Sequence, residues 1–495
     1  MKNTARRIVM DITMEHKSFN SYSEIFSGEK LCKLSADAVI PDTYDDISKL
    51  LVTEFNLKII SKDVSFGKIS VSGEVQANTL FIPENSTKPE SIITSSPFTA
   101  DFAAENADSS SLAIASLKLS AADWRELNPR KIGVNTDILV EVKAFSRTEM
   151  NIPCEKPENC NGAFFKSDTK QVKNISLVSE KLASIEDEHE IGGITAVVFG
   201  GTECFCDSAE LVGNKLILKG HTHSKILYRK DNGELDSLEY DTQFSQLFDH
   251  DENAEIADYE CVMLTAGEYY EVNGSMLNME LRIVMQLVCY ENREVTYVSD
   301  AYSCGCEYEL LTDETEVTVN MESTVYTQNV QLSCELPENQ RKVCVTGAST
   351  GKMSLSGNTA VVPVTINALS FGDDNVYSFR VRGNAEFEDV SCENLSAWTD
   401  NISCAIIGNR AEFEAAVKLK GNCAVKERIA AVSAISVNVE VNKNIAPSVI
   451  IARAESGDIW DIAKKYGADQ NRVAEINALQ DGEDIRGRML LIPKA

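Results

Sequence analysis

Two cysteines and two histidines with the chemistry of zinc ligands lie on either side of one predicted β-turn. The turn is Gly213-Asn214, and it would join two strands in a two-residue hairpin. This register places the four side chains in opposite pairs on one face of the sheet: Cys206 with His221, and Cys204 with His223. Two thiolates and two imidazoles form a common zinc ligand set, so this hairpin is the first candidate for a metal site.

The same register also argues against a metal. It gathers an apolar set on the opposite face, which is therefore the core face: Phe205, Ala209, Leu211, Leu216 and Leu218. The four candidate ligands would then lie on a polar, flatter face, which approximates a tetrahedron poorly. A bulge at Gly200-Gly201 would also shift the register. We therefore expect no bound metal.

The other reactive residue types form no catalytic constellation. The five histidines show no Ser-His-Asp order, no GxxxxGK[ST] phosphate loop occurs, and 76 carboxylates make any chosen acidic pair arbitrary. Cys304 and Cys306 are close in sequence, as are Cys154 and Cys160, but no histidine or helix N-terminus adjoins either pair. These thiols could form a cross-link late in assembly. We expect a non-enzymatic protein without a cofactor.

Composition narrows the class of partner. The chain has 495 residues with 47 Lys and Arg against 76 Asp and Glu, which gives a net charge of −29. This charge repels nucleic acid and anionic membranes. No stretch approaches the roughly 18 apolar residues of a membrane span, and the N-terminus lacks the apolar region of a signal peptide. We expect a cytoplasmic protein, without direct membrane insertion, whose cysteines are mostly free thiols.

Strand patterns dominate up to about residue 440. Apolar and polar residues alternate, and glycine turns recur in three related blocks, DVSFGKISVSG, AELVGNKLILKG and ASTGKMSLSG. Gly67 and Gly213 are equivalent positions, and Phe98 and Phe244 follow them at equal spacing. We predict a mainly β protein with three tandem β-sandwich-like repeats. The expected boundaries are an N-terminal segment at 1–30, repeats at 31–146, 181–306 and 307–438 (the last with a leading strand), and linkers at 147–180 and 439–448.

The last residues, 449–495, carry a different pattern. A weakly alternating strand over 449–454 precedes GDIWDIAKKYG, in which one helical face is apolar: Ile459, Ile462, Ala463 and Tyr466. Asp458 is expected to cap this helix and Gly467 to end it. NRVAEIN predicts a second helix with Val473 and Ile476 inward, and MLLIP predicts a closing strand over 489–493. We therefore predict that residues 449–495 form a β-α-α-β domain that folds independently.

This C-terminal segment resembles a LysM domain. The likeness rests on SGDIWDIAKKYG, NRVAEINAL and RGRMLLIP, which stand in the family order. The β repeats resemble SPOCS domains, which occur with a C-terminal LysM domain in spore-coat morphogenetic proteins of endospore-forming bacteria. That likeness rests on IPDTYDDI, SSPFTADF and LNPRKIGVNTDILVEVKAF, with counterparts in the later repeats.

The resemblance implies a function in spore-coat assembly. The SPOCS-like repeats would act as a scaffold that meets other coat proteins, and the LysM domain would bind the sporulation ATPase of the coat basement layer. The location would be the mother-cell side of the forespore surface. The alternative is binding of peptidoglycan or other N-acetylglucosamine polymers through LysM. Asp458 runs through Ile459 directly to Trp460, without the threonine common in LysM domains, and this departure favours a protein partner over a glycan.

The expected partner site is the groove between two loops of the LysM-like segment. We predict that it is formed by Gly457, Asp458, Ile459, Trp460, Ala478 and Leu479, flanked by Arg486 and Arg488. Two interpretations of Trp460 stay open. Its ring is either an exposed anchor for a partner or part of the hydrophobic core.

Overall fold

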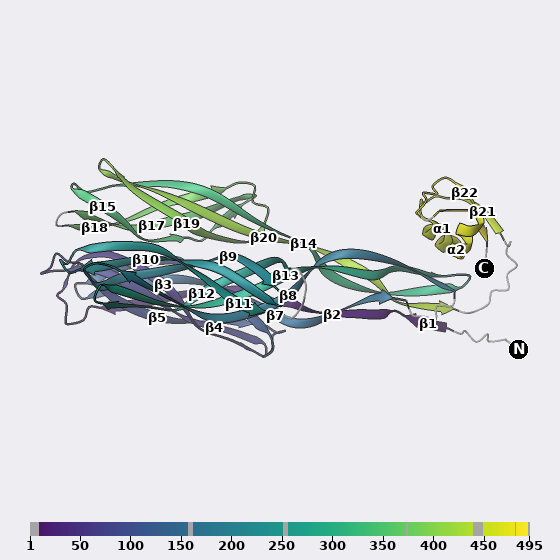
Figure 1. Cartoon of the computed structure of the whole chain (residues 1–495), viewed down its shortest axis with the longest axis horizontal. Helices are drawn as coiled ribbons and strands as arrows, with labels where there is room; N and C mark the ends of the chain where they lie inside the picture. The colour runs from purple at the N-terminus through teal and green to yellow at the C-terminus, as the bar shows by residue number, and fades with distance from the viewer. Residues whose placement is uncertain are drawn as a thin grey trace.

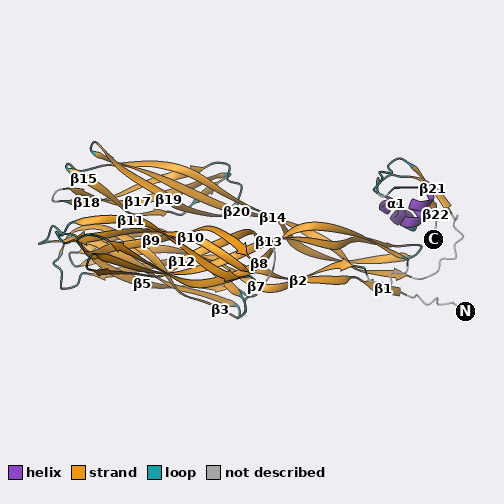
Figure 2. Cartoon of the chain, in the orientation of Figure 1, coloured by secondary structure: helices purple, strands orange, loops and turns teal. Residues whose placement is uncertain are grey.

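The three β-rich blocks each fold into a pair of antiparallel sheets. The computed structural model describes residues 9–156, 162–250, 256–372, 375–438, 449–480 and 482–493. The chain is mainly β, as predicted, with two short helices near its C-terminus (Figures 1 and 2). In the first block, lobe 1, the first sheet has the order β2–β7–β6 and the second β3–β4–β5. Their bounds are β2 (Glu15–Val39), β3 (Ile47–Ser65), β4 (Lys68–Pro83), β5 (Glu90–Ala103), β6 (Leu112–Asn128) and β7 (Lys131–Glu155).

Lobes 2 and 3 repeat this arrangement. Lobe 2 has the orders β8–β13–β12 and β9–β10–β11, with β8 (Ala163–Glu190), β9 (Ile194–Val212), β10 (Lys215–Lys230), β11 (Leu235–Asp249), β12 (Ile256–Asn273) and β13 (Met276–Ser303). In lobe 3, β20 lies between β14 and β19 and also pairs with β1, while β17 pairs with β15, β16 and β18. The bounds are β1 (Val9–Thr13), β14 (Glu307–Glu335), β15 (Gln340–Thr350), β16 (Ser354–Ser356), β17 (Thr359–Gly372), β18 (Val376–Phe387), β19 (Glu393–Ile407) and β20 (Arg410–Asn438).

The predicted glycine turns at Gly67 and Gly213 are hairpin turns of lobes 1 and 2, whereas lobe 3 turns at Gly357, the last residue of ASTGKMSLSG and six residues after the position equivalent to Gly67. Gly67, Gly213 and Gly357 have φ values of 74°, 63° and 59°, in the left-handed region that glycine adopts without strain. They lie in the two-residue loops that precede β4, β10 and β17. Each lobe buries alternate residues of its two sheets against each other, as shown by Val71 with Ile138 in lobe 1.

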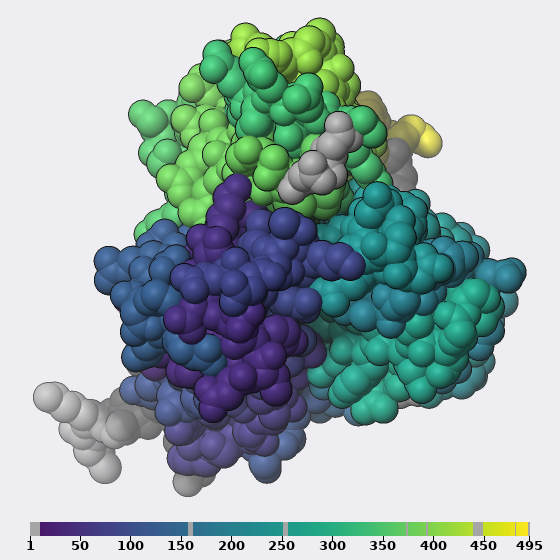
Figure 3. Space-filling view, turned by 90° about the vertical axis from the view of Figure 1, so that its left-hand side faces the viewer, coloured from purple at the N-terminus to yellow at the C-terminus, as the bar shows by residue number. Residues whose placement is uncertain are grey.

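The three lobes lie against one another (Figure 3), and an apolar cluster fills the junction between them. Each lobe contributes buried residues to this one cluster: Leu51, Val52 and Leu80 from lobe 1, Val198 and Leu227 from lobe 2, and Cys344 and Leu369 from lobe 3. This cluster gives a physical reason for the lobes to lie side by side instead of as separate units in a row.

A narrower stalk extends from the lobes (Figure 1). It consists of the continuations of β2 with β7, β8 with β13, and β14 with β20, joined by β1. Its core takes residues from these pairs: Ile152, Val172, Val295, Val317, Ile429 and Ala431. Further along, Ile12 and Met14 pack against Val298 and Ile435.

Two of the predicted domain boundaries are wrong, because the segments concerned belong to the stalk. Segment 147–180 was predicted to be a linker, but β7 continues to Glu155 and β8 begins at Ala163. The N-terminal segment 1–30 contains β1 and the start of β2. Both segments are polar because only alternate side chains, such as those of Ile152 and Val172, enter the narrow stalk core. The predicted linker 439–448 lies outside the described residues.

The C-terminal module, residues 449–493, folds in the predicted β-α-α-β order. Its elements are β21 (Val449–Arg453), α1 (Ile459–Tyr466), α2 (Gln470–Ile476) and β22 (Met489–Pro493). Asp458 caps α1, and Gly467 ends it with φ 60°, as expected. Val473 is buried, but the prediction for Ile476 is wrong, because that side chain is 50% exposed at the last residue of α2. Within the described residues, neither helix has the length and apolar character needed to traverse a bilayer.

Candidate functional site

The four candidate zinc ligands do not share a face of the sheet. In the observed register Cys206 is opposite Gly220 and Cys204 is opposite Thr222. The histidines are displaced by one residue, so His221 is opposite Phe205 and His223 is opposite Glu203. The expectation of one common face is therefore wrong, because paired residues project to the same side and the two types now alternate.

A β-bulge at Asp207 causes this displacement. The predicted register holds from the turn to the pair Lys219–Ser208, and then Gly220 pairs with Cys206. Gly220 allows the close approach, since a Cβ there would lie 2.3 Å from the carbonyl oxygen of Phe205 and 2.6 Å from the ring of Phe244. The slip expected at Gly200-Gly201 is instead found beside it, between Leu227 and Tyr228 on the partner strand.

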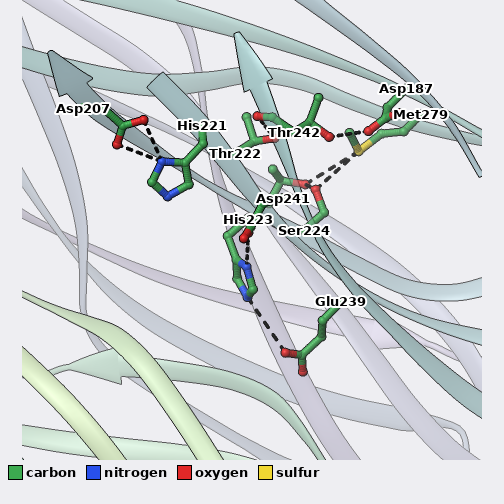
Figure 4. Close-up of polar contacts among 11 residues, drawn as sticks. Asp187, Asp207, His221, Thr222, His223, Ser224, Glu239, Asp241, Thr242 and Met279 are labelled. Atoms are coloured by element: carbon green, nitrogen blue, oxygen red, sulfur yellow. Dashed lines mark hydrogen bonds and ion pairs between the residues drawn. The ribbon is translucent and has the colours of Figure 1, made fainter. Parts of the chain in front are cut away.

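Each histidine ring contacts an aspartate carboxylate on the face of the sheet opposite the cysteines (Figure 4). His221 Nδ1 lies 2.9 Å from an Asp207 oxygen, and His223 Nδ1 lies 2.7 Å from an Asp241 oxygen. The two cysteines instead pack against the core of lobe 2. Burial raises the pKa of Cys204 to about 12, so this thiol is neutral and a poor ligand. Within the described ranges, no group of three or more His, Cys, Asp or Glu residues could hold a metal ion.

The most complete polar and aromatic cluster of the described residues joins the C-terminal module to the end of the stalk. Trp460 is only 5% exposed, and its indole Nε1 donates to Asp300 Oδ2 at 2.9 Å. Lys464 Nζ donates to both oxygens of the same carboxylate, at 2.6 and 2.7 Å. Since Trp460 and Lys464 are four residues apart, both project from one face of α1 toward β13.

Tyr302 completes the contact from the same strand. Its ring packs edge-to-face on Trp460, with centroids 4.9 Å apart, and it stacks on Phe164 of β8. Its hydroxyl donates to the carbonyl of Ala468 at 3.0 Å. Tyr302 is fully buried, so the module and the stalk exclude water from this hydrogen bond.

The end of α1 binds the turn that follows β13. The amide of Gly305 donates to the carbonyl oxygen of Gly467 at 3.1 Å, and the Cys304 thiol donates to the same oxygen at 3.2 Å. Burial raises the pKa of Cys304, with a further increase from the charge of Asp469, so this thiol is a weak nucleophile. In the other close pair, Cys154 with Cys160, Cys160 lies outside the described residues.

An ion pair closes the contact at the other end of α1. Lys166 Nζ lies 2.7 Å from Asp458 Oδ2, while Asp458 Oδ1 accepts from the amide of Trp460. Burial alone would raise the pKa of Asp458, but the hydrogen bonds from Lys166 and Trp460 outweigh it and lower that pKa. Asp458 therefore caps the helix and pairs with the stalk through the same carboxylate.

The eight predicted partner residues are divided between two surfaces. Trp460 faces the stalk and is covered, so the expectation that it lines an open groove does not hold in this structure. Ile459 and Leu479 lie together at the rim of the module core. The remaining members lie in the loops beside that rim: Gly457 accepts from the amide of Ile485, Asp458 is the helix cap, and Ala478, Arg486 and Arg488 are exposed. Arg488 forms an ion pair with Glu483 at 2.6 Å.

Sequence reasoning missed the stalk residues of the contact. Lys166, Asp300 and Tyr302 lie 160 or more residues before the module residues that they contact, and no spacing rule connects them. The sequence feature that could have indicated this contact is a pair of aromatic residues, Phe164 and Tyr302, in largely polar segments. They face each other on β8 and β13.

Comparisons with protein-family models, with curated proteins and with solved structures found no match to this chain.

Proposed function

We propose that the chain is a non-enzymatic assembly protein of the spore coat. The observation that carries the proposal is the position of the module, which lies at the end of a stalk, away from the three lobes (Figure 1). A three-lobed body that presents a small domain at one extremity suits a scaffold that connects two layers. The resemblance of the lobes to SPOCS domains and of the module to LysM supplies the biological setting.

The proposed partner of the module is the ATPase that forms the coat basement layer. Charge supports a protein contact through the module: residues 449–495 carry 7 basic against 8 acidic residues, so almost all of the −29 belongs to the remainder. The module can therefore approach an acidic protein with little repulsion. The accessible part of the predicted groove offers Ile459 and Leu479 beside Arg486.

Co-sedimentation with the polymerised ATPase tests this proposal. Arg486→Glu reverses an exposed charge in the groove, and we expect it to weaken binding about tenfold, equivalent to about 1.4 kcal/mol. Lys465→Glu is the matched control, since it reverses an exposed charge on α1 outside the groove and breaks a surface ion pair with Glu455 and a long contact with the Tyr466 ring.

The two functional hypotheses give different results. Binding of the ATPase that responds to Arg486→Glu and not to Lys465→Glu supports coat assembly. If the chain does not bind the ATPase but binds N-acetylglucosamine oligomers saturably, the coat-assembly hypothesis is wrong and the glycan hypothesis replaces it. Equal effects of the two substitutions would remove the groove from the proposed interface.

A further inference from the structure

The contact between the module and the stalk joins two parts that are each complete. The module has its own core of Ile462, Ala468, Val473, Ile485, Leu490 and Ile492. The stalk has separate cores, which draw on all three of its strand pairs. Among the described strands, β21 and β22 pair only with each other, so no sheet crosses from one part to the other. Neither part needs the contact in order to bury its core.

The stalk side of the contact is a preformed receptor. We define the tip receptor as Lys166, Asp300, Tyr302 and Gly305 on β8, β13 and the following turn. These residues are held by the long β8–β13 pairing, in which Tyr302 is opposite Phe164 and Asp300 is opposite Lys166. The receptor offers one carboxylate, one ammonium group, one aromatic ring and one backbone amide, and the module satisfies each of them.

The contacts between the described residues of the module and the stalk would be the same for the module of another copy, so covalent attachment is what assigns a module to its own stalk. Ten residues separate Asn438, the end of β20, from Val449, the start of β21. Ten residues span at most about 35 Å when extended. A short connection of this kind holds a tethered site at an effective concentration on the order of 1 mM. A module from another molecule makes identical contacts and competes once its local concentration approaches that value.

We propose that the tip receptor also binds the module of a second copy of this chain, so that molecules connect by exchange of their C-terminal modules. When two molecules exchange modules, the same module–receptor contacts form as within one molecule. The balance between the two arrangements therefore depends on the concentration of the chain. Crowding of many copies on one surface favours exchange. This inference concerns self-association and is independent of which protein or glycan the groove binds.

Two full-length variants with complementary defects test the exchange. Asp300→Lys disables the receptor, because it repels Lys464 and removes the acceptor of the Trp460 indole, but it leaves the module intact. Trp460→Ala combined with Lys464→Ala disables the module and leaves the receptor intact. Trp460 belongs to the contact cluster and not to the module core, so the module of the second variant should stay folded. Circular dichroism checks both variants, and Lys464→Ala alone is a milder substitute.

Sedimentation velocity gives the readout. We expect each variant alone to be monomeric and an equimolar mixture to form a 1:1 dimer, through the intact module of one and the intact receptor of the other. Wild-type chain in place of either variant should suppress the dimer at micromolar concentration, since its own receptor is filled. A mixture that stays monomeric up to about 1 mM, the effective concentration of the tethered contact, would overturn the proposal. Dimerisation of either variant by itself would overturn it too, because another surface would then be responsible.

Discussion

Glu54 is a buried carboxyl between lobes 1 and 3. The folded chain should lose stability as the pH rises to neutral, and Glu54→Gln should prevent that loss. The side chain is 9% exposed on β3 of lobe 1 and reaches into lobe 3. Thr346 Oγ1 donates to it at 2.5 Å and Asn367 Nδ2 at 3.4 Å. Gly347 leaves it just enough room, since a Cβ at that position would lie 2.3 Å from Glu54 Oε2.

The structure fixes both the sign and the size of the expected effect. Burial raises the pKa of Glu54 from 4.5 to about 7, although hydrogen bonds from Thr346 and Asn367 and the charges of Arg380 and Lys225 oppose the increase. The unfolded chain releases this proton near pH 4.5 and the folded chain retains it to about pH 7. Stability is therefore lost between these values as the pH rises. At about 1.36 kcal/mol for each pKa unit, the loss is about 3 kcal/mol above pH 7.

Urea unfolding at pH 5 and pH 8 measures the effect. Between these two pH values the wild-type chain should lose about 2.5 kcal/mol more than Glu54→Gln, slightly less than the full effect because the unfolded chain has already released most of the proton at pH 5. The amide has no proton to release and still accepts from Thr346. Glu412→Gln, at an exposed position of β20, is the matched control and should keep the wild-type pH dependence. Parallel curves for wild type and Glu54→Gln would refute the assignment of a raised pKa to this carboxyl.

Three further outcomes are expected. Gly220→Ala should destabilise the chain by about 2 kcal/mol or more in urea unfolding, because the added Cβ meets the carbonyl of Phe205, whereas Gly213→Ala meets open space and should cost only about 1 kcal/mol for its left-handed backbone. Elemental analysis should find less than one zinc per chain, and a stoichiometric zinc that is lost in Cys204→Ser would contradict the divided ligand set. A 445–495 fragment should show a cooperative thermal transition by circular dichroism, since the module has its own core; a gradual, non-cooperative loss of signal would show that it needs the stalk.

Features that depend on local sequence could be predicted. The glycine hairpins of lobes 1 and 2, the three β blocks and the capped helix of the module each rest on residues a few positions apart, and the structure confirms them. The stalk could not be predicted in this way. Segment 147–180 was predicted to be a polar linker, because a narrow core accepts only alternate residues, such as Ile152 and Val172. Ile476 was placed inward from helical period alone, but the second helix ends there.

The candidate sites failed for two different physical reasons. The zinc hypothesis assumed an unbroken register, and a single extra residue, Asp207, moved the histidines to the face opposite the cysteines. The prediction of an accessible Trp460 considered the module alone. Its aromatic ring and the Lys464 one turn later do form a recognition surface, but the surface is filled by Asp300 and Tyr302 of the same chain.

Strand β13 explains why the tip receptor can be precise although it lies far from the lobes. The strand runs without interruption from Met276 to Ser303. Its first half buries Leu281 and Met285 in the core of lobe 2, and its second half buries Val298 in the stalk before it presents Tyr302 to the module. A β-bulge between Val298 and Asp300 resets the alternation of side chains before the receptor, and the pairs Asp300–Lys166 and Tyr302–Phe164 that follow it fix the receptor residues on β13 and β8. Three of the four receptor residues therefore take their positions from paired strands, and only Gly305 comes from the turn that follows β13.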